Sequence, residues 1–277
     1  MSAGEKAMKS DVLEHLPEDR FRALCEIIRM LRSPEGCPWD RKQTPESLVT
    51  HLLEEAHEVV ETIDQKNWEE LKGELGDLIM HAVFQAQIGA EENRFDIDAV
   101  LDTVIRKLIR RHPHVFDSAE VESAEEVIRN WEQIKLEEGR ESVLEGVPKS
   151  LSALNRASRL QARASQVGFD WDEPAQVWEK VAEEIEELKE VAEQEDPEKI
   201  EEEFGDLLFS LVNISRFVGV NAENALRKAT NKFVRRFQEV EQQVKGQKQD
   251  MSDMNLDELD EYWEQVKRSE KESGRNH

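Results

Sequence analysis

Cysteine, glycine, proline and long apolar runs are all scarce in this 277-residue sequence. Its two cysteines, Cys25 and Cys37, cannot supply a disulfide framework or a four-ligand zinc site, so we expect a reducing compartment. Twelve glycines and eight prolines are few for a fold of short strands and tight turns. The composition therefore favours an all-α protein.

Targeting segments and phosphate-binding loops are also missing. Residues 1–20 are too polar for a signal peptide, and no apolar stretch approaches the length of a transmembrane helix. The sequence has no Gly-x-x-x-x-Gly-Lys-Ser/Thr motif, which disfavours a P-loop fold. We expect a cytoplasmic protein without a membrane partner.

Positive charge is in short supply. Lysine and arginine together number 37 against 62 aspartate and glutamate residues, which gives a net charge of −25. Such a surface repels nucleic acids and anionic lipids, so we expect no nucleic-acid partner. Most of the surplus acids can simply keep the protein soluble. A protein of this charge that handles phosphates would need cations to mediate, which points to a bound metal.

What the sequence does contain is an internal repeat of five blocks in the same order. Its acidic blocks have identical spacings of 3, 16 and 3 residues in Glu55, Glu58, Glu74, Asp77 and in Glu184, Glu187, Glu203, Asp206. The other blocks pair residues 39–40 with 171–172, 107–111 with 232–236, and 131–135 with 263–267. Five matching blocks are a poor fit to chance, so the chain is expected to be a tandem repeat.

The repeat predicts two helical domains. We expect an N-terminal extension at 1–19, a first domain at 20–140, a linker at 141–155, a second domain at 156–270 and a polar tail at 271–277. The Gly146 and Pro148 residues favour a turn or linker between the halves.

Apolar residues around the acids recur with the period of an amphipathic helix. Residues 65–67 and 195–197 are expected to be short turns between two such helices. Asp196 is expected to cap the helix after the second turn, and Asp170 or Asp172 to cap the helix before it. The apolar stripes of the second half contain Val181, Ile185, Leu188 and Ala192, then Phe204, Leu207, Leu208 and Leu211.

Residues three apart on a helix are neighbours, so each half carries one acid pair on each of two helices. At about 100° per residue, both pairs of a hairpin fall on the same side of the apolar stripe. An antiparallel hairpin brings those sides together, whereas a parallel arrangement would separate them. We therefore expect four carboxylates to converge in each half.

Four ionised carboxylates in one place repel each other unless a cation neutralises them. Hard oxygen ligands suit Mg²⁺, with Mn²⁺ as an alternative, and such ions retain waters and add substrate phosphate oxygens. An isolated Glu-x-x-Glu is far more often part of a solvated helix face. Two copies of a four-acid pattern at identical spacing favour metal sites instead.

A basic block later in each half complements the acids. Lys232 and Arg236 are four residues apart and share a helix face, beside Phe233 and Phe237. These cations could hold phosphate groups, or they could only balance the surplus acids. Trp263 is a candidate for stacking on a base, although a core tryptophan is the commoner case.

Together these motifs resemble the MazG-type nucleoside triphosphate pyrophosphohydrolases. The acidic signature of that family, Glu-Glu-x-x-Glu followed by Glu-x-x-Asp, begins here at Glu54 and again at Glu183. Segments 37–40, 111–116 and 168–171 look like those of the two-domain members. The resemblance covers nearly the whole chain apart from its two ends.

The resemblance implies hydrolysis of nucleoside triphosphates between the α- and β-phosphates, with broad base preference and a role in clearing the nucleotide pool. It also implies a homodimer, which would complete a four-helix bundle around each hairpin. Dimerisation is expected on physical grounds as well, because a single hairpin has an apolar face too large to leave in water.

The resemblance assigns residues too, with catalysis in the second half. It implies Mg²⁺ held by Glu184, Glu187, Glu203 and Asp206, with Glu55, Glu58, Glu74 and Asp77 as a second candidate site. It implies nucleotide contacts from Lys180, Lys199, Lys232, Arg236 and Trp263, with Lys107, Arg111 and Trp131 as first-half counterparts. A glutamate not fully committed to the metal, Glu183 or Glu184, is the candidate for orienting or deprotonating the attacking water.

Two alternatives remain open from the sequence. The chain could be a non-catalytic acidic scaffold or a regulatory nucleotide-binding protein, although neither requires repeated metal-ligand spacing. The first half keeps all its acids, so the identity of the working half is also open. His57 and His81 align with Glu186 and Ser210 and are expected to be structural or surface residues.

Overall fold

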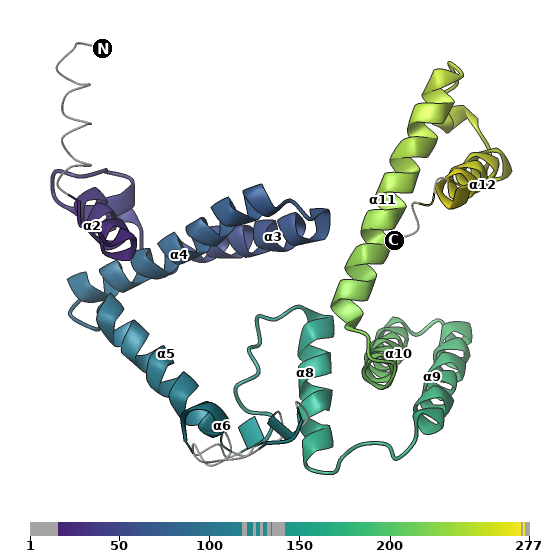
Figure 1. Cartoon of the computed structure of the whole chain (residues 1–277). Helices are drawn as coiled ribbons and strands as arrows, with labels where there is room; N and C mark the ends of the chain where they lie inside the picture. The colour runs from purple at the N-terminus through teal and green to yellow at the C-terminus, as the bar shows by residue number, and fades with distance from the viewer. Residues whose placement is uncertain are drawn as a thin grey trace. The chain divides into compact units, whose positions relative to one another are not determined.

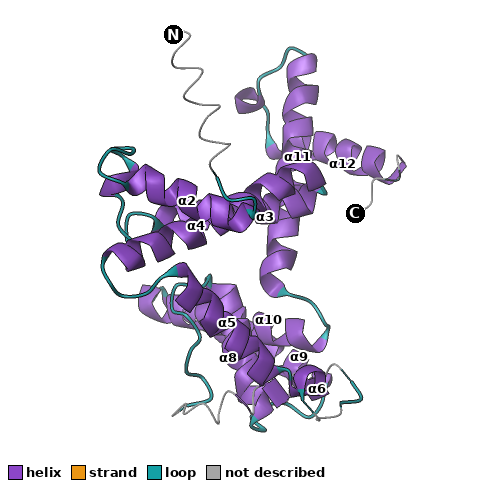
Figure 2. Cartoon of the chain, turned by 60° about the vertical axis from the view of Figure 1, so that its left-hand side comes forward, coloured by secondary structure: helices purple, strands orange, loops and turns teal. Residues whose placement is uncertain are grey.

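The structure is a computed structural model that describes residues 16–117, 121–123, 126, 127, 130, 131, 134, 142–272 and 274. These residues form helices and connecting turns, and no strand occurs among them (Figures 1 and 2). The all-α class predicted from the sequence is confirmed. Most of the expected N-terminal extension and part of the expected polar tail lie outside the described residues.

The chain divides into two compact units, Met1–Ala124 and Glu125–His277. The first unit contains α2 (Arg20–Arg32), η1 (Asp40–Lys42), α3 (Val49–Gln65), α4 (Trp68–Glu91), α5 (Ile97–Arg111) and α6 (Pro113–Phe116). The second contains α8 (Ala153–Gln166), α9 (Pro174–Gln194), α10 (Pro197–Phe217), α11 (Ala222–Gly246), η2 (Met251–Asp253) and α12 (Leu256–Glu272). The expected bounds of the domains and the linker remain a prediction. No described helix has both the length and the apolar character needed to cross a membrane.

Each unit is organised around a helical hairpin, α3–α4 in the first and α9–α10 in the second (Figure 1). Only Lys66 and Asn67 separate the first pair, and only Glu195 and Asp196 separate the second. Lys66 and Glu195 both adopt a left-handed backbone, with φ of 57° and 55°. This conformation ends the helix and reverses the chain, so the paired helices run antiparallel. The short turns expected from the sequence are confirmed.

Local capping explains where the second hairpin helix of each pair begins. The Asn67 side chain accepts a hydrogen bond from the backbone N–H of Glu70, and the Asp196 carboxylate accepts from Glu198 at 3.2 Å. Both residues satisfy backbone donors that the first turn of a helix leaves unpaired. Asp196 is therefore the N-cap that the sequence predicts, with Pro197 as the first helical residue.

The prediction for the start of α9 is wrong. The N-cap residue is Glu173, whose backbone N–H donates to the Gln176 side chain at 3.1 Å, and neither Asp170 nor Asp172 takes this role. The physical reason is position, because α9 begins at Pro174 and the N-cap is the residue directly before the first helical residue. The Asp170 carboxylate instead binds the guanidinium of Arg216 on α10 at 2.6 Å.

The hairpins leave much of their apolar surface open in the single chain. Val181 is buried, but Phe204, Leu208 and Leu211 on α10 are exposed, with 52% of Phe204 accessible to solvent. Leu75 and Ile79 on α4 are exposed in the same way. The packed cores are small, one around Ile28, Val83 and Phe84 and another around Val240, Val244 and Val266. The apolar stripes thus form as expected without being fully covered.

Asp196→Ala should destabilise the second hairpin by about 1 kcal/mol, because the first turn of α10 loses its side-chain cap. The measurement is the midpoint of urea unfolding followed by far-ultraviolet circular dichroism. Asp196→Asn is the matched control, since an asparagine oxygen can accept the same hydrogen bond, and it should stay close to the wild type. Equal losses in both variants would show that the charge, rather than the cap, stabilises the turn.

Candidate metal and nucleotide site

The antiparallel hairpin of the second unit brings three acids together. One carboxylate oxygen from each of Glu184, Glu187 and Glu203 lies within 4.8 Å of the others. Glu184 and Glu187 are neighbours on α9, and Glu203 faces them from α10. Asp206, one turn after Glu203, falls outside this distance but is close enough to raise the pKa of Glu203.

The first unit repeats the arrangement. Glu55 and Glu58 on α3 and Glu74 on α4 form a group with the same 4.8 Å limit. Asp77 is again the outlying member, and its charge contributes to the raised pKa values of Glu55 and Glu74. In each unit the structure therefore places three predicted acids in contact range and the fourth beside them.

Electrostatics show that these groups repel one another. Partial desolvation raises the pKa of Glu203 above its ordinary value, and the charges of Glu187, Asp206 and Glu184 raise it further. Desolvation is also the largest cause of the raised pKa of Glu55, followed by repulsion from its acidic neighbours. A cluster of carboxylates that disfavours its own charge is the environment in which a bound cation gains most.

The donor set fits a magnesium-sized ion. Mg²⁺ binds oxygen ligands at about 2.0–2.1 Å, so oxygens on opposite sides of one ion are about 4 Å apart. Three carboxylate oxygens within 4.8 Å of each other can reach such an ion with small side-chain adjustments. All-oxygen ligands with no sulfur or imidazole also favour Mg²⁺ or Mn²⁺ over softer metals.

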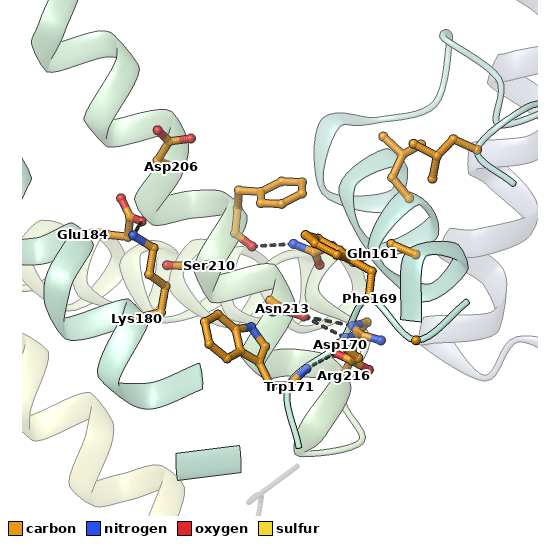
Figure 3. Close-up of a pocket in the computed structure, with 15 residues that line it drawn as sticks. Gln161, Phe169, Asp170, Trp171, Lys180, Glu184, Asp206, Ser210, Asn213 and Arg216 are labelled. Atoms are coloured by element: carbon orange, nitrogen blue, oxygen red, sulfur yellow. Dashed lines mark hydrogen bonds and ion pairs between the residues drawn. The ribbon is translucent and has the colours of Figure 1, made fainter. Parts of the chain in front are cut away.

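A cavity of about 830 Å³ adjoins the acids of the second unit (Figure 3). Glu184 and Asp206 line it together with Lys180, and all its lining residues belong to this unit. Its volume lies within the range of about 300–1,000 Å³ that is typical of small-molecule sites. The metal-ligand candidates thus open onto a space large enough for a nucleotide.

Lys180 lies at the metal end of the cavity. Its ammonium nitrogen lies 2.8 Å from a carboxylate oxygen of Glu184 and 3.0 Å from a carboxylate oxygen of Glu183. Both glutamates are about one turn further along α9. The hydrogen bonds to Glu184 and then Glu183 raise the pKa of Lys180, so it stays charged. Glu184 has only 6% of its side chain exposed, whereas Glu183 is 56% exposed. A phosphate group can replace either carboxylate as the partner of this cation.

The loop between α8 and α9 closes another side of the cavity. Gly168 has a φ of +86°, which an ordinary residue rarely adopts, and it turns the chain after α8. The turn brings Phe169, Asp170 and Trp171 to the cavity wall, and the Asp170–Arg216 pair ties the loop to α10. The sequence marks residues 168–171 only as part of the family resemblance, and their place in the cavity wall was not predicted.

The equivalent positions of the first unit differ. With the acids aligned, His51 stands where the second unit has Lys180, and Phe84 stands where it has Asn213. Phe84 is 5% exposed and packs in the core with Ile28, with the Arg32 guanidinium over its ring at 5.2 Å. The first unit therefore keeps the acids but fills part of the corresponding space with an aromatic core residue.

The two histidines beside the first-unit acids in the sequence, His57 and His81, differ in their exposure to solvent. His57 is exposed, and His81 is buried with 5% exposure. Burial, followed by the charge of His51, lowers the pKa of His81, so its neutral form is favoured. Neither histidine belongs to a group of metal-ligand side chains among the described residues.

The predicted nucleotide contacts on α11 and α12 lie outside this cavity lining. The Arg236 guanidinium binds Glu270 at 2.8 Å and lies over the Trp263 ring at 5.8 Å. Trp263 also contacts Phe233 at 5.4 Å between ring centroids and packs against the Val240–Val244–Val266 core. Lys232 is exposed on α11, and Lys199 lies near Asp196 at the start of α10. Their roles toward the nucleotide remain predictions.

The first-unit counterparts are placed as follows. Lys107 is exposed on α5 and borders a shallow apolar pocket with Phe95 and Val100. Arg111 is the last residue of α5, and Trp131 lies in a segment of which only a few residues are described. The roles of these three residues toward the nucleotide remain predictions.

Comparison with known proteins supports the repeat. A family model described as the MazG nucleotide pyrophosphohydrolase domain matches residues 43–116 and again 173–241. A Thermotoga maritima protein named nucleoside triphosphate pyrophosphohydrolase/pyrophosphatase MazG is 48% identical over 89% of this chain and 95% of its own length. An Escherichia coli nucleoside triphosphate pyrophosphohydrolase is 46% identical over 89% and 97%. A Bacillus subtilis protein named uncharacterized protein YabN is 42% identical over 94% of this chain and 54% of its own.

Glu203→Gln should stabilise the metal-free protein near neutral pH. Because the pKa of Glu203 is raised in the folded state, its repulsion destabilises the fold at high pH and weakens as the pH falls through that raised value. The advantage of the variant should therefore vanish below the ordinary glutamate pKa of 4.5. Thermal unfolding in EDTA between pH 4 and 8 measures this.

Adding Mg²⁺ should reverse the order, since the wild type gains a ligand that the variant lacks. Glu201→Gln, at an exposed position on the same helix outside the acid group, is the control. A variant that is less stable than the wild type at neutral pH in EDTA would contradict repulsion within the cluster.

Proposed function

The chain belongs to the MazG nucleotide pyrophosphohydrolase family, and on this premise we propose that it hydrolyses nucleoside triphosphates between the α- and β-phosphates. The products are a nucleoside monophosphate and pyrophosphate. Support comes from two relatives of 46–48% identity that carry this activity in their names and match this chain over nearly their whole length.

One observation carries the assignment to this molecule. Glu184 and Asp206, which are candidate metal ligands, share a cavity with the cation Lys180. A triphosphate requires both elements, because its charge has to be neutralised and its leaving group held in position. An acidic scaffold requires neither a cavity nor a cation at its acid cluster.

We assign catalysis to the second unit. The supporting difference is local, since the first unit has His51 in place of Lys180 and the buried Phe84 in place of Asn213. Its acid group could still bind a cation, which would serve structure or regulation. This division explains why the acid spacing is retained in both halves while the surrounding residues differ.

The residues of the second unit have separable roles in this proposal. Mg²⁺, when bound by Glu184, Glu187, Glu203 and Asp206, supplies charge neutralisation and a bound water of lowered pKa. Glu183 or Glu184 orients the attacking water and accepts its proton. Water oxygen then bonds to phosphorus as the bridging P–O bond breaks. Attack at the α- or the β-phosphorus gives the same products.

Lysine and arginine side chains hold the phosphates that the metal does not. Lys180 is already at the metal end of the cavity, and Lys199 lies in the first turn of the helix that carries Glu203 and Asp206. Lys232, Arg236 and Trp263 on α11 and α12 are proposed to reach the nucleotide in the assembled protein. We expect broad base preference, Mg²⁺ as the working metal and Mn²⁺ as a substitute.

Incubation with each nucleoside triphosphate and Mg²⁺, followed by chromatography, tests the reaction. We expect monophosphate and pyrophosphate in equal amounts and no activity in excess EDTA. Orthophosphate as the initial product would mean that a different bond is cleaved. Failure to convert any triphosphate would remove the enzymatic proposal and favour the nucleotide-binding scaffold.

Glu184→Gln with Glu187→Gln should lower the rate by at least about 100-fold, because metal ligands are lost next to the cavity. The matched pair Glu55→Gln with Glu58→Gln alters the equivalent first-unit acids and should retain most of the activity. Both pairs should keep the helical circular dichroism of the wild type. Equal loss of activity in the two pairs would contradict a single active half.

We also propose a homodimer, supported by the open apolar face of α10. Leu208→Gln with Leu211→Gln should shift the protein from dimer toward monomer in light-scattering measurements, because both side chains are exposed in the single chain. Leu256→Gln, which changes an even more exposed residue at the start of α12, should leave the dimer intact. A monomeric wild type would reject the dimer.

A further inference from the structure

The cavity of the second unit extends well beyond the acid cluster. Glu184, Lys180 and Asp206 occupy one side of the view in Figure 3, and Gln161, Asp170 and Arg216 occupy the other. Asp206 and Asn213 both line the cavity from α10, and seven residues of helix span about 10 Å. Metal-bound phosphates at the acidic end would leave the far end for the rest of the nucleotide.

Gln161 at the far end carries an unusual buried group. It lies on α8, is 8% exposed, and donates from Nε2 to the backbone carbonyl of Phe209 at 2.8 Å. This bond orients the amide, so its Oε1 atom remains as an acceptor. Within the described part of the chain, no hydrogen-bond donor reaches this buried oxygen. Since an unpaired buried polar atom is destabilising, a ligand that enters the cavity is a natural partner.

An aromatic side chain stands in the middle of the same cavity. Trp171 lies between the acidic end and the Asp170–Arg216 pair in Figure 3 and is 41% exposed. Its position is fixed from both sides, because Gly168 turns the chain before it and the Asp170 carboxylate binds Arg216 at 2.6 Å and accepts from the Trp171 backbone N–H at 3.0 Å. A large, partly exposed ring on an anchored loop is suited to stacking on a flat ligand.

We propose that the far end of this cavity is the nucleobase subsite, in which Gln161 Oε1 accepts an N–H from the base edge and Trp171 stacks on the base. The inference rests on the proposed function, which places the phosphates at the acidic end. It assigns the base to α8 and the α8–α9 loop instead of Trp263, whose ring is packed against Phe233 and the α11–α12 core.

The subsite chemistry also explains broad base acceptance. Nε2 of Gln161 is committed to Phe209, so the side chain offers a base only an acceptor. Each common base carries at least one N–H donor on its Watson–Crick edge, and each has a face that can stack. One acceptor and one aromatic ring therefore select for a base without selecting strongly among bases.

Binding of three hydrolysis-resistant ligands tests the subsite independently of turnover. The ligands are the α,β-methylene analogues of ATP, of purine riboside triphosphate, which lacks the adenine amino group, and of base-free ribose 5′-triphosphate. Calorimetry with the full-length protein and Mg²⁺ gives each Kd. The wild type should bind the ATP analogue about 5-fold more tightly than the purine analogue, as expected for one hydrogen bond.

Gln161→Leu should abolish this discrimination, bringing the ratio of the two Kd values close to 1, and should leave the Kd of the ribose ligand unchanged. The substitution keeps side-chain volume, and the Phe209 carbonyl can still accept within α10, so the fold should persist. Gln166→Leu, on the same helix at an exposed position outside the cavity lining, is the matched control and should keep the wild-type ratio.

Trp171→Ala should weaken binding of the ATP and purine analogues about 10-fold or more, while the Kd of the ribose ligand changes less than about 2-fold. Trp178→Ala, at an exposed position on α9 outside the cavity lining, is its control. An unchanged ATP-to-purine ratio in Gln161→Leu, or equal weakening of all three ligands in Trp171→Ala, would overturn the subsite.

The two proposals fail in different ways. Gln161-dependent binding without any triphosphate turnover would reject hydrolysis while supporting the base subsite. Turnover with base recognition that is insensitive to Gln161 and Trp171 would support hydrolysis while rejecting the subsite. In the second case, Trp263→Ala identifies the alternative, since a base stacked on Trp263 requires that ring.

Discussion

The two-residue turns at Lys66–Asn67 and Glu195–Asp196 set the geometry on which the sites depend. In each turn, a residue with a left-handed backbone ends the first helix and an N-cap residue begins the second. The chain therefore cannot separate the two helices or run them parallel. Acids three residues apart on each helix consequently meet across the hairpin. A longer or more flexible turn would leave the same glutamates as ordinary solvated side chains.

Bringing acids together works against folding, and the raised pKa values of Glu55, Glu74 and Glu203 record that repulsion. The hairpins tolerate it because most of these acids stay at least partly exposed to water, and Glu184 is the buried member of the two acid groups in the described part of the chain. The repulsion between the carboxylates also favours cation binding, since a bound cation attracts each of the carboxylates around it. The same clustering therefore opposes folding of the metal-free chain and provides the reason to expect a bound cation.

The two units keep the same acids but differ around them. In the second unit, Lys180 and Asn213 border a cavity, whereas in the first unit the aligned positions hold His51 and the buried Phe84. A repeat can thus conserve its charged hairpin while exchanging polar cavity residues for core. This explains why acid spacing alone is insufficient to identify a working site: substrate binding depends on what occupies the neighbouring volume.

Sequence by itself determined the helical class, the repeat, the Asp196 cap and the convergence of the acids, because each follows from local periodicity and a short turn. Tertiary structure alone decided the partners that are distant in sequence. Asp170 binds Arg216 rather than capping α9, and Gln161 contributes an unpaired oxygen to a cavity bordered by Lys180. Such contacts depend on how α8 and its loop pack on α10, and helical periodicity does not specify how helices joined by a longer loop or distant in sequence pack together.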